Sequence, residues 1–232
     1  MSVSVTVDVD GVAGLACRPG GPWEGRLTSR SEHEFVWRGL ERVVAVLERH
    51  GARATFYVPG VTLLENPCVF AELVAAGHEL GHHGHAHLPT SACDEREELL
   101  RGLDALATIG ITARGYRSPG WELTPRTFSL LGEFGFVWDS SLMGDERPYR
   151  LGPLIELPVH WRLDDVPYWT AHRDPREVLA IWTAEHDHAD GHLTYTIHPE
   201  LTGRGARLTL LDGLLDHIGP TTTHGDACAA VR

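Results

Sequence analysis

Short apolar runs alternate with segments of helical periodicity along most of the 232-residue chain. Runs rich in apolar and β-branched residues predict strands, and they cover residues 3–7, 54–58, 136–138, 154–159 and 194–197. Apolar residues that recur every three or four positions predict helices at 38–50, 69–76, 95–107, 125–134, 175–188 and 207–218. Strands that alternate with helices predict parallel βαβ units, and about seven repeats favour an α/β barrel over a two-layer sheet.

Polar residues follow several of these apolar runs directly. Asp8 and Asp10 end the first predicted strand, Asp139 and His198 follow later strands, and Arg117 lies near the end of another. In a parallel barrel, functional side chains lie at the carboxyl ends of the strands. We therefore expect these groups to meet at one mouth of the barrel. Residues 18–30 are rich in Gly, Pro and Ser and predict a loop over that mouth.

Histidine is unusually dense in one segment. The chain has 15 histidines, and five of them lie within residues 78–87. His83 and His87 are four residues apart, so one helical turn would place both imidazoles on the same side, where they can bind one metal ion. Gly84 argues against a long helix, so a turn or short helix after a strand is expected. The other three histidines are expected to have supporting, structural or surface roles.

The two acids of the first strand can complete the metal site that the histidines suggest. Asp8 and Asp10 project to the same side, because side chains alternate along a strand. Two carboxylates inside a barrel are costly unless a cation is present, so one can bind the metal and the other can act as general base. Two histidines and one aspartate leave coordination positions open, as in catalytic sites. These ligand types favour Zn²⁺, with other divalent first-row ions left open.

Composition limits which partners and which cellular compartment we expect. The formal net charge of −12 disfavours nucleic acid and anionic membranes, which repel an acidic surface. No apolar run approaches the roughly 18 residues of a membrane span. The first residues lack a basic segment and a cleavage site, and the four cysteines form no CxxC pair. We expect a cytoplasmic protein with free thiols that acts on a small molecule or a glycan.

Five segments, in order along residues 5–199, resemble the five motifs of the polysaccharide deacetylase family, which is carbohydrate esterase family four and is also called NodB-like. They are Thr6-Val7-Asp8-Val9-Asp10-Gly11, residues 77–87, Arg117-Ser118-Pro119-Gly120-Trp121, residues 138–143 and Ile197-His198-Pro199. The resemblance implies that Asp8 is the base and that Asp10, His83 and His87 are the metal ligands. It also implies that the third-motif arginine, Arg117, holds the base carboxylate.

The same resemblance makes His198 the general acid. A protonated imidazole needs a nearby carboxylate, and the choice stays open between Asp139, Asp164 and Asp165, with Asp139 favoured. Trp121 and Trp161 are expected either to wall the pocket or to pack inside the barrel.

The spacing Asp8-Val9-Asp10 is closest to one branch, which holds intracellular peptidoglycan-deacetylase-like proteins and allantoinases. That likeness implies one domain over residues 1–232, a distorted barrel of about seven parallel strands, and a possible homo-oligomer. Residues 221–232 depart from many relatives, because they lack an aromatic pair. The expected function is metal-dependent hydrolysis of a non-peptide C–N bond, deacetylating an N-acetylated sugar or related amide. The alternatives are ring opening of a cyclic amide such as allantoin or an imide, and ligand binding without turnover.

Overall fold

The computed structural model describes residues 2–13, 31 and 33–231. The loop expected at residues 18–30 and the thiol of Cys17 lie outside the described residues. Eight strands form one sheet in the order β6-β7-β5-β4-β3-β2-β1-β8. They are β1 (Ser2–Asp8), β2 (Ala54–Val58), β3 (Glu79–His82), β4 (Gly115–Tyr116), β5 (Trp138–Asp139), β6 (Tyr149–Leu151), β7 (Leu154–Glu156) and β8 (His192–Ile197).

The sheet curls into a half-barrel, with seven of the eight strands running parallel. Only β6 is antiparallel, where it pairs with β7. The two ends of the strand order, β6 and β8, do not pair with each other, so the barrel has an open seam. An isolated parallel bridge between Asp164 and Thr196 places the chain after β7 along the free edge of β8. The expected α/β barrel of about seven parallel strands is confirmed.

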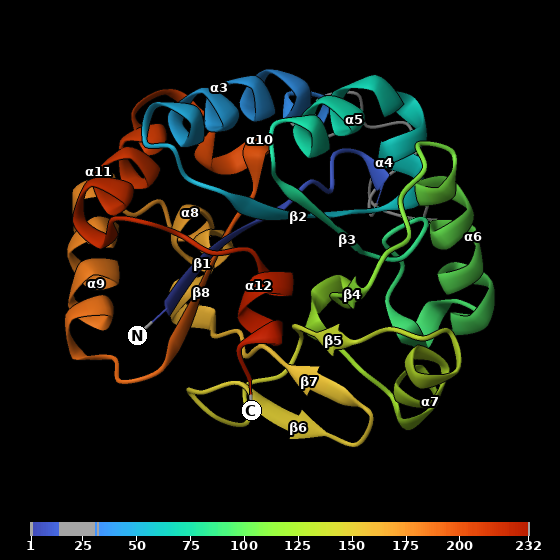
Figure 1. Ribbon diagram of the computed structural model, residues 1–232. Helices are drawn as coiled ribbons and strands as arrows, with labels where there is room; N and C mark the ends of the chain where they lie inside the picture. The colour runs from blue at the N-terminus through green and yellow to red at the C-terminus, as the bar shows by residue number, and fades with distance from the viewer. Residues whose placement is uncertain (1, 14–30, 32, 232) are drawn as a thin grey trace.

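Helices pack around the outside of the curled sheet (Figure 1). The longer ones are α3 (Val36–Arg49), α5 (Pro67–Ala75), α6 (Glu95–Ala107), α7 (Pro125–Glu133), α9 (Pro175–His188) and α11 (Leu208–Ile218). Shorter ones are α4 (Gly60–Glu65), α8 (Asp165–Thr170), α10 (Pro199–Thr202) and α12 (His224–Ala229). In contrast to the others, α12 lies within the curve of the sheet (Figure 1).

Helix boundaries match the sequence patterns well where capping is strong. Helices α6 and α9 have the predicted bounds, and their N-cap residues Asp94 and Asp174 accept backbone hydrogen bonds from the first turn. Strand boundaries match less well. The run 136–138 contributes only Trp138 to β5, and the run 154–159 forms a strand only to Glu156. Strands of two or three residues are too short to show a periodic pattern.

The two faces of the sheet differ in polarity. On β1, Val3, Val5 and Val7 belong to the hydrophobic core that the surrounding helices cover. The alternate side chains of the same strand point to the inside of the half-barrel and carry hydroxyl or carboxyl groups: Ser2, Ser4, Thr6 and Asp8. The outer face therefore supplies apolar burial, and the inner face holds polar side chains that bond to one another.

Candidate active site

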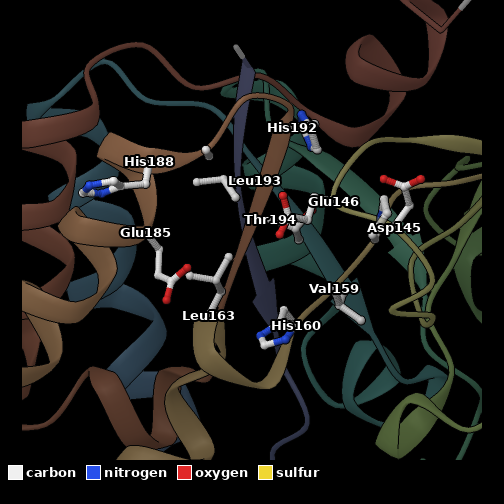
Figure 2. A pocket seen from close by; sticks show the side chains of 12 residues that line it. Asp145, Glu146, Val159, His160, Leu163, Glu185, His188, His192, Leu193 and Thr194 are labelled. Carbon is white, nitrogen blue, oxygen red and sulfur yellow. The ribbon is translucent and has the colours of Figure 1, made fainter.

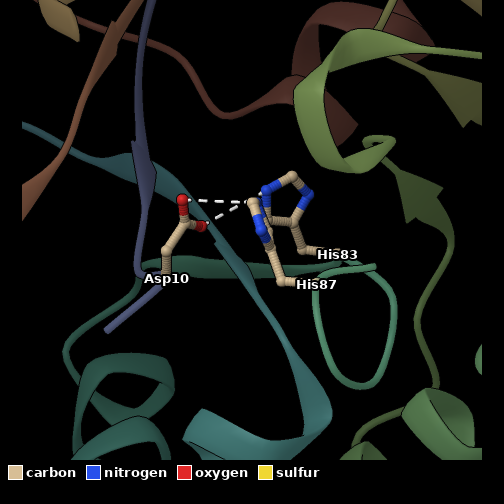
Figure 3. Close-up of side chains that lie close together, drawn as sticks. All are labelled: Asp10, His83 and His87. Atoms are coloured by element: carbon tan, nitrogen blue, oxygen red, sulfur yellow. Dashed lines mark ion pairs between the residues drawn. The ribbon is translucent and has the colours of Figure 1, made fainter. Parts of the chain in front are cut away.

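Asp10, His83 and His87 converge at the carboxyl end of the sheet (Figure 3). Nε2 of His83 lies 3.4 Å from Asp10 Oδ1, and Nε2 of His87 lies 3.2 Å from Asp10 Oδ2. One potential ligand atom from each residue lies within 4.8 Å of the others. Within the described residues, Asp10 Oδ1 is buried without a hydrogen-bond partner. A buried carboxylate oxygen without a partner is costly, so the donor set fits a divalent first-row cation.

The two histidines reach this position through an irregular loop. The chain leaves β3 at His82 and forms no helical turn between His83 and His87. Instead, Gly84 and His87 adopt left-handed conformations, with φ of +72° and +52°. The expected helical turn is therefore wrong, although the two imidazoles do converge. The carboxylate of Glu98 on α6 accepts hydrogen bonds from two backbone N–H groups of this loop and ties it to the helix.

A backbone hydrogen bond sets the tautomer of His83. Its Nδ1 lies 2.7 Å from the carbonyl oxygen of Arg117. A carbonyl can only accept, so Nδ1 donates, and Nε2 is directed at Asp10. Metal-binding histidines are commonly oriented in this way, through a bond from the other ring nitrogen.

The ionisation of two members of the cluster also suits a cation. Burial raises the pKa of Asp10, but the imidazoles of His87 and His83 outweigh it and hold that pKa far below its usual range. Burial lowers the pKa of His87 to about 4, against the opposing effect of Asp10. An ionised carboxylate and a neutral imidazole are the forms that ligate metals. Burial lowers the pKa of His83, but Asp10 and Asp8 outweigh it and raise that pKa.

Asp8 is held by Arg117 beside this cluster. Arg117 is fully buried, and its Nη1 donates to Asp8 Oδ1 at 2.7 Å. The same guanidinium donates to the carbonyl and the hydroxyl oxygen of Ser140. The second oxygen of Asp8, Oδ2, lies 3.9 Å from Nε2 of His83. One carboxylate oxygen is therefore anchored, and the other faces the metal-binding side chains.

His198 faces the same cluster from β8, and its partner is Asp165. Nδ1 of His198 lies 2.7 Å from Asp165 Oδ1, and its backbone N–H donates to Oδ2 of the same carboxylate. Nε2 lies 3.8 Å from Asp10 Oδ2. Burial lowers the pKa of His198, but Asp165, Asp10 and Asp164 outweigh it and raise that pKa well above its usual value.

The expectation that Asp139 orients His198 is wrong. Asp139 ends β5, and four strands (β4, β3, β2 and β1) separate β5 from β8 in the sheet. Its Oδ1 accepts a hydrogen bond from Ser141 instead. Asp165 can reach His198 because its neighbour Asp164 pairs with Thr196 at the open seam.

Asp139 instead forms a buried pair with Glu156, a residue to which the sequence assigned no role. Backbone N–H groups of Ser141 and Leu142 donate to Glu156 Oε1. Burial, and then the charge of Asp139, raises the pKa of Glu156 to about 10, and burial raises the pKa of Asp139 to about 6. Two adjacent buried carboxyl groups cannot both ionise cheaply, so the pair retains a proton at neutral pH.

The remaining histidines of the cluster are buried away from Asp10. Nε2 of His82 bonds the carbonyl of Leu99, and its Nδ1 accepts from the backbone N–H of Gly84. His78 accepts a hydrogen bond from the backbone N–H of Ala54. These contacts fit structural roles.

Trp121 and Trp161 stack on each other near Arg117. Their ring centroids are 4.4 Å apart, and the ring planes are 26° apart. Trp121 is buried and lies 5.9 Å from the guanidinium of Arg117, whereas Trp161 is 47% exposed. One member of the pair thus packs inside the barrel, and the other presents an aromatic surface to solvent.

A separate cavity of about 230 Å³ lies at the seam, beside the amino half of β8 (Figure 2). Its lining includes His160, His192 and Glu185 but none of the residues that converge on Asp10. It does not belong to the site described above.

A curled parallel sheet with ionisable groups at the carboxyl ends of its strands is the architecture of barrel enzymes. A family model described as polysaccharide deacetylase matches residues 37–137. A solved protein from Mycobacterium smegmatis, classed as a polysaccharide deacetylase, is 31% identical, with a TM-score of 0.89 over 100% of this chain and 90% of its own. The chain belongs to the polysaccharide deacetylase family, as its motifs predicted.

Two further relatives are informative. A peptidoglycan deacetylase from Helicobacter pylori is 26% identical over 93% of this chain and 89% of its own length. A solved allantoinase has a TM-score of 0.85 at 20% identity, over 98% of this chain and 89% of its own, a likeness that shows the fold alone. Among the described residues, no helix has the length and apolar character needed to cross a membrane.

Proposed function

We propose that this chain removes the acetyl group from an N-acetylated sugar, with a divalent cation, Zn²⁺ by ligand type, held by Asp10, His83 and His87. Family membership makes the chain a hydrolase of carbon–nitrogen amide bonds. The observation that carries the proposal is the convergence of three ligand atoms within 4.8 Å, with Asp10 Oδ1 buried and without a hydrogen bond from any described residue.

When bound, the cation would acidify a water molecule and polarise the acyl carbonyl oxygen. Asp8 is placed to act as general base, because Oδ2 faces the cluster while Arg117 holds Oδ1. The charged hydrogen bond from Arg117 fixes the direction of this carboxylate. Asp8 takes one proton from the attacking water, and the hydroxyl adds to the acyl carbon.

His198 is placed to act as general acid. Its Nε2 faces the cluster, and its Nδ1 donates to Asp165. That carboxylate stabilises the protonated imidazole and fixes its orientation. His198 donates its proton to the nitrogen as the carbon–nitrogen bond breaks, which yields acetate and a free amine. Asp165 is the positioning residue for this step.

The sugar substrate is supported by the relatives and by one surface feature. The H. pylori relative is described as a peptidoglycan deacetylase. Beside the site, the exposed face of Trp161 offers an apolar aromatic surface of the kind on which a ring can pack. An N-acetylated glycan is therefore the substrate class that we propose.

The test combines metal analysis with a substrate panel of chitooligosaccharides, peptidoglycan fragments and allantoin. We expect metal bound at the Asp10 cluster and acetate released from the N-acetyl sugars. His83→Gln should abolish both metal binding and acetate release. The matched control is His217→Gln, which changes a second His-Asp-His group, on α9 and α11, and should leave acetate release intact.

Three results would contradict the proposal. Ring opening of allantoin without acetate release from any sugar would support the cyclic amide alternative. Tight ligand binding without turnover on any amide would support a binding barrel. Full activity in His83→Gln would remove the proposed metal site.

A further inference from the structure

Arg117 rests on the aromatic ring of Tyr57 inside the half-barrel. The guanidinium carbon lies 4.3 Å from the centroid of the Tyr57 ring, and both side chains are fully buried. A cation over an aromatic face is attracted to it, most strongly where water is excluded. The ring therefore supports the guanidinium that holds Asp8.

The Tyr57 ring is itself held at its hydroxyl end. The hydroxyl shares a hydrogen bond of 2.7 Å with Nδ1 of His224 and accepts one from Nε1 of Trp138 at 3.3 Å. Burial keeps the pKa of His224 well below its usual value, so the imidazole is neutral. Its Nε2 lies 3.3 Å from the hydroxyl of Thr194 on β8.

The neighbouring strand leaves room for this ring at a glycine. Tyr57 on β2 is paired in register with Gly81 on β3. A Cβ atom at Gly81 would lie 2.4 Å from Cε1 of Tyr57, which is well inside van der Waals contact. Only glycine at this position lets the ring lie flat across β3 and under Arg117.

His224 belongs to α12, the C-terminal helix that lies within the curve of the sheet (Figure 1). The backbone N–H of His224 donates to the hydroxyl of Thr55, and that of Gly225 donates to Glu79. The C-terminal segment thus inserts a buried histidine into the barrel.

We infer that Tyr57 and His224 are positioning residues for the active site: His224 holds the Tyr57 ring, the ring seats Arg117, and Arg117 directs Asp8. The inference rests on the proposed function for the role of Asp8. The seating of Arg117 can be tested without turnover.

The activity test compares three variants with a matched control. Tyr57→Leu removes the ring face and should lower kcat by about 100-fold while KM stays within about twofold, because a small displacement of a catalytic group is enough for such a loss. Tyr57→Phe keeps the face and loses the hydroxyl bond, so most of the rate should be retained, with a loss of roughly fivefold. His224→Leu should lower the rate by about as much as Tyr57→Phe, because it removes the same hydroxyl bond.

The control is Tyr195→Phe. Tyr195 is also fully buried on a strand and makes one hydroxyl bond, to the carbonyl of Trp182, but it faces the outer helices. It should lose stability like Tyr57→Phe and keep full kcat. Equal rate losses in both Tyr→Phe variants would reduce Tyr57 to a structural residue.

The second measurement is independent of substrate. Nε–H of Arg117 donates to the Ser140 carbonyl and is fully buried, so ¹⁵N-labelled protein should show it as a slowly exchanging signal. Tyr57→Leu should shift that signal and speed its exchange, and Tyr195→Phe should do neither. If Tyr57→Leu does not fold, His224→Leu decides by the same signal. An unchanged signal overturns the inference, whereas inactivity of the wild type with a changed signal counts only against the proposed function.

Discussion

The two faces of strands β1 and β8 carry different kinds of side chain. On the outer face, Val5 of β1 and Ile197 of β8 join the core under the helices, and burial of apolar area stabilises the fold. On the inner face, Thr6 and Thr196 bond to each other and receive the guanidinium of Arg117. A barrel interior is more often filled with branched apolar side chains. Here the interior carries a polar hydrogen-bonded network, and its carboxyl end carries the ionisable groups.

The comparison teaches that stability and activity can be changed separately. Outer-face substitutions should lower the free energy of unfolding and leave the rate intact. Inner-face substitutions at the carboxyl end should lower the rate and change the free energy of unfolding less. Their groups act on the substrate or on one another.

The largest effect is expected for Asp10→Asn. Asparagine removes the carboxylate that both imidazoles face, so metal affinity should fall and acetate release should drop by roughly 10⁴-fold, in the range for loss of a group that works as part of a unit. Metal content and initial rates measure it. Asp187→Asn, on the surface of α9, serves as control. Unaltered metal content in Asp10→Asn would refute the ligand assignment.

The next largest effect is expected for Asp165→Asn. Without the carboxylate, His198 loses support for its protonated form, and kcat should fall by about 10³-fold, the middle of the range for acid–base groups. Asp139→Asn should have a far smaller effect on kcat, because four strands separate Asp139 from His198 in the sheet order. If Asp139→Asn lowered kcat far more than Asp165→Asn, the assignment of Asp165 as the partner of His198 would be wrong.

Leu211→Ala tests the outer face. Leu211 of α11 is fully buried in the core, so its truncation should lower the free energy of unfolding by about 3 kcal/mol. Denaturant unfolding measures the loss, and kcat of the folded fraction should equal that of the wild type. A fall in kcat of tenfold or so would show that the two faces are coupled.

The smallest effect concerns the buried pair of Glu156 and Asp139. The folded pKa values are raised, to about 10 and about 6, above ordinary values of 4.5 and 3.8. The folded state therefore holds more protons than the unfolded chain, and the free energy of unfolding falls as pH rises above pH 4.5.

Glu156→Gln keeps the shape and removes this titration. Between about pH 5 and about pH 8, the wild type should lose at least ~1 kcal/mol more stability than the variant. Urea unfolding at both pH values makes the comparison. Identical slopes with pH would show that the pair does not retain a proton.

Much of the fold and of the candidate site was predictable from local patterns. The strand of alternating residues that ends at Asp8 and the helices α6 and α9 follow from periodicity. The convergence of Asp10 with His83 and His87 followed from the family resemblance, because the two histidines lie on an irregular loop and not on a helical turn. The catalytic roles of these residues stay predictions, as do the single domain over 1–232 and the oligomeric state.

The sequence by itself determined which chemical groups exist and on which side of a strand they project, because the alternation of side chains and the preferences of metal ligands are local properties. Only the tertiary structure decided that Asp165 rather than Asp139 meets His198, and that Tyr57 and His224 lie beneath Arg117. The reason is physical. Strands as short as β4 and β5 take their places from the packing of the whole sheet, so the neighbours across the barrel cannot be inferred from any one segment.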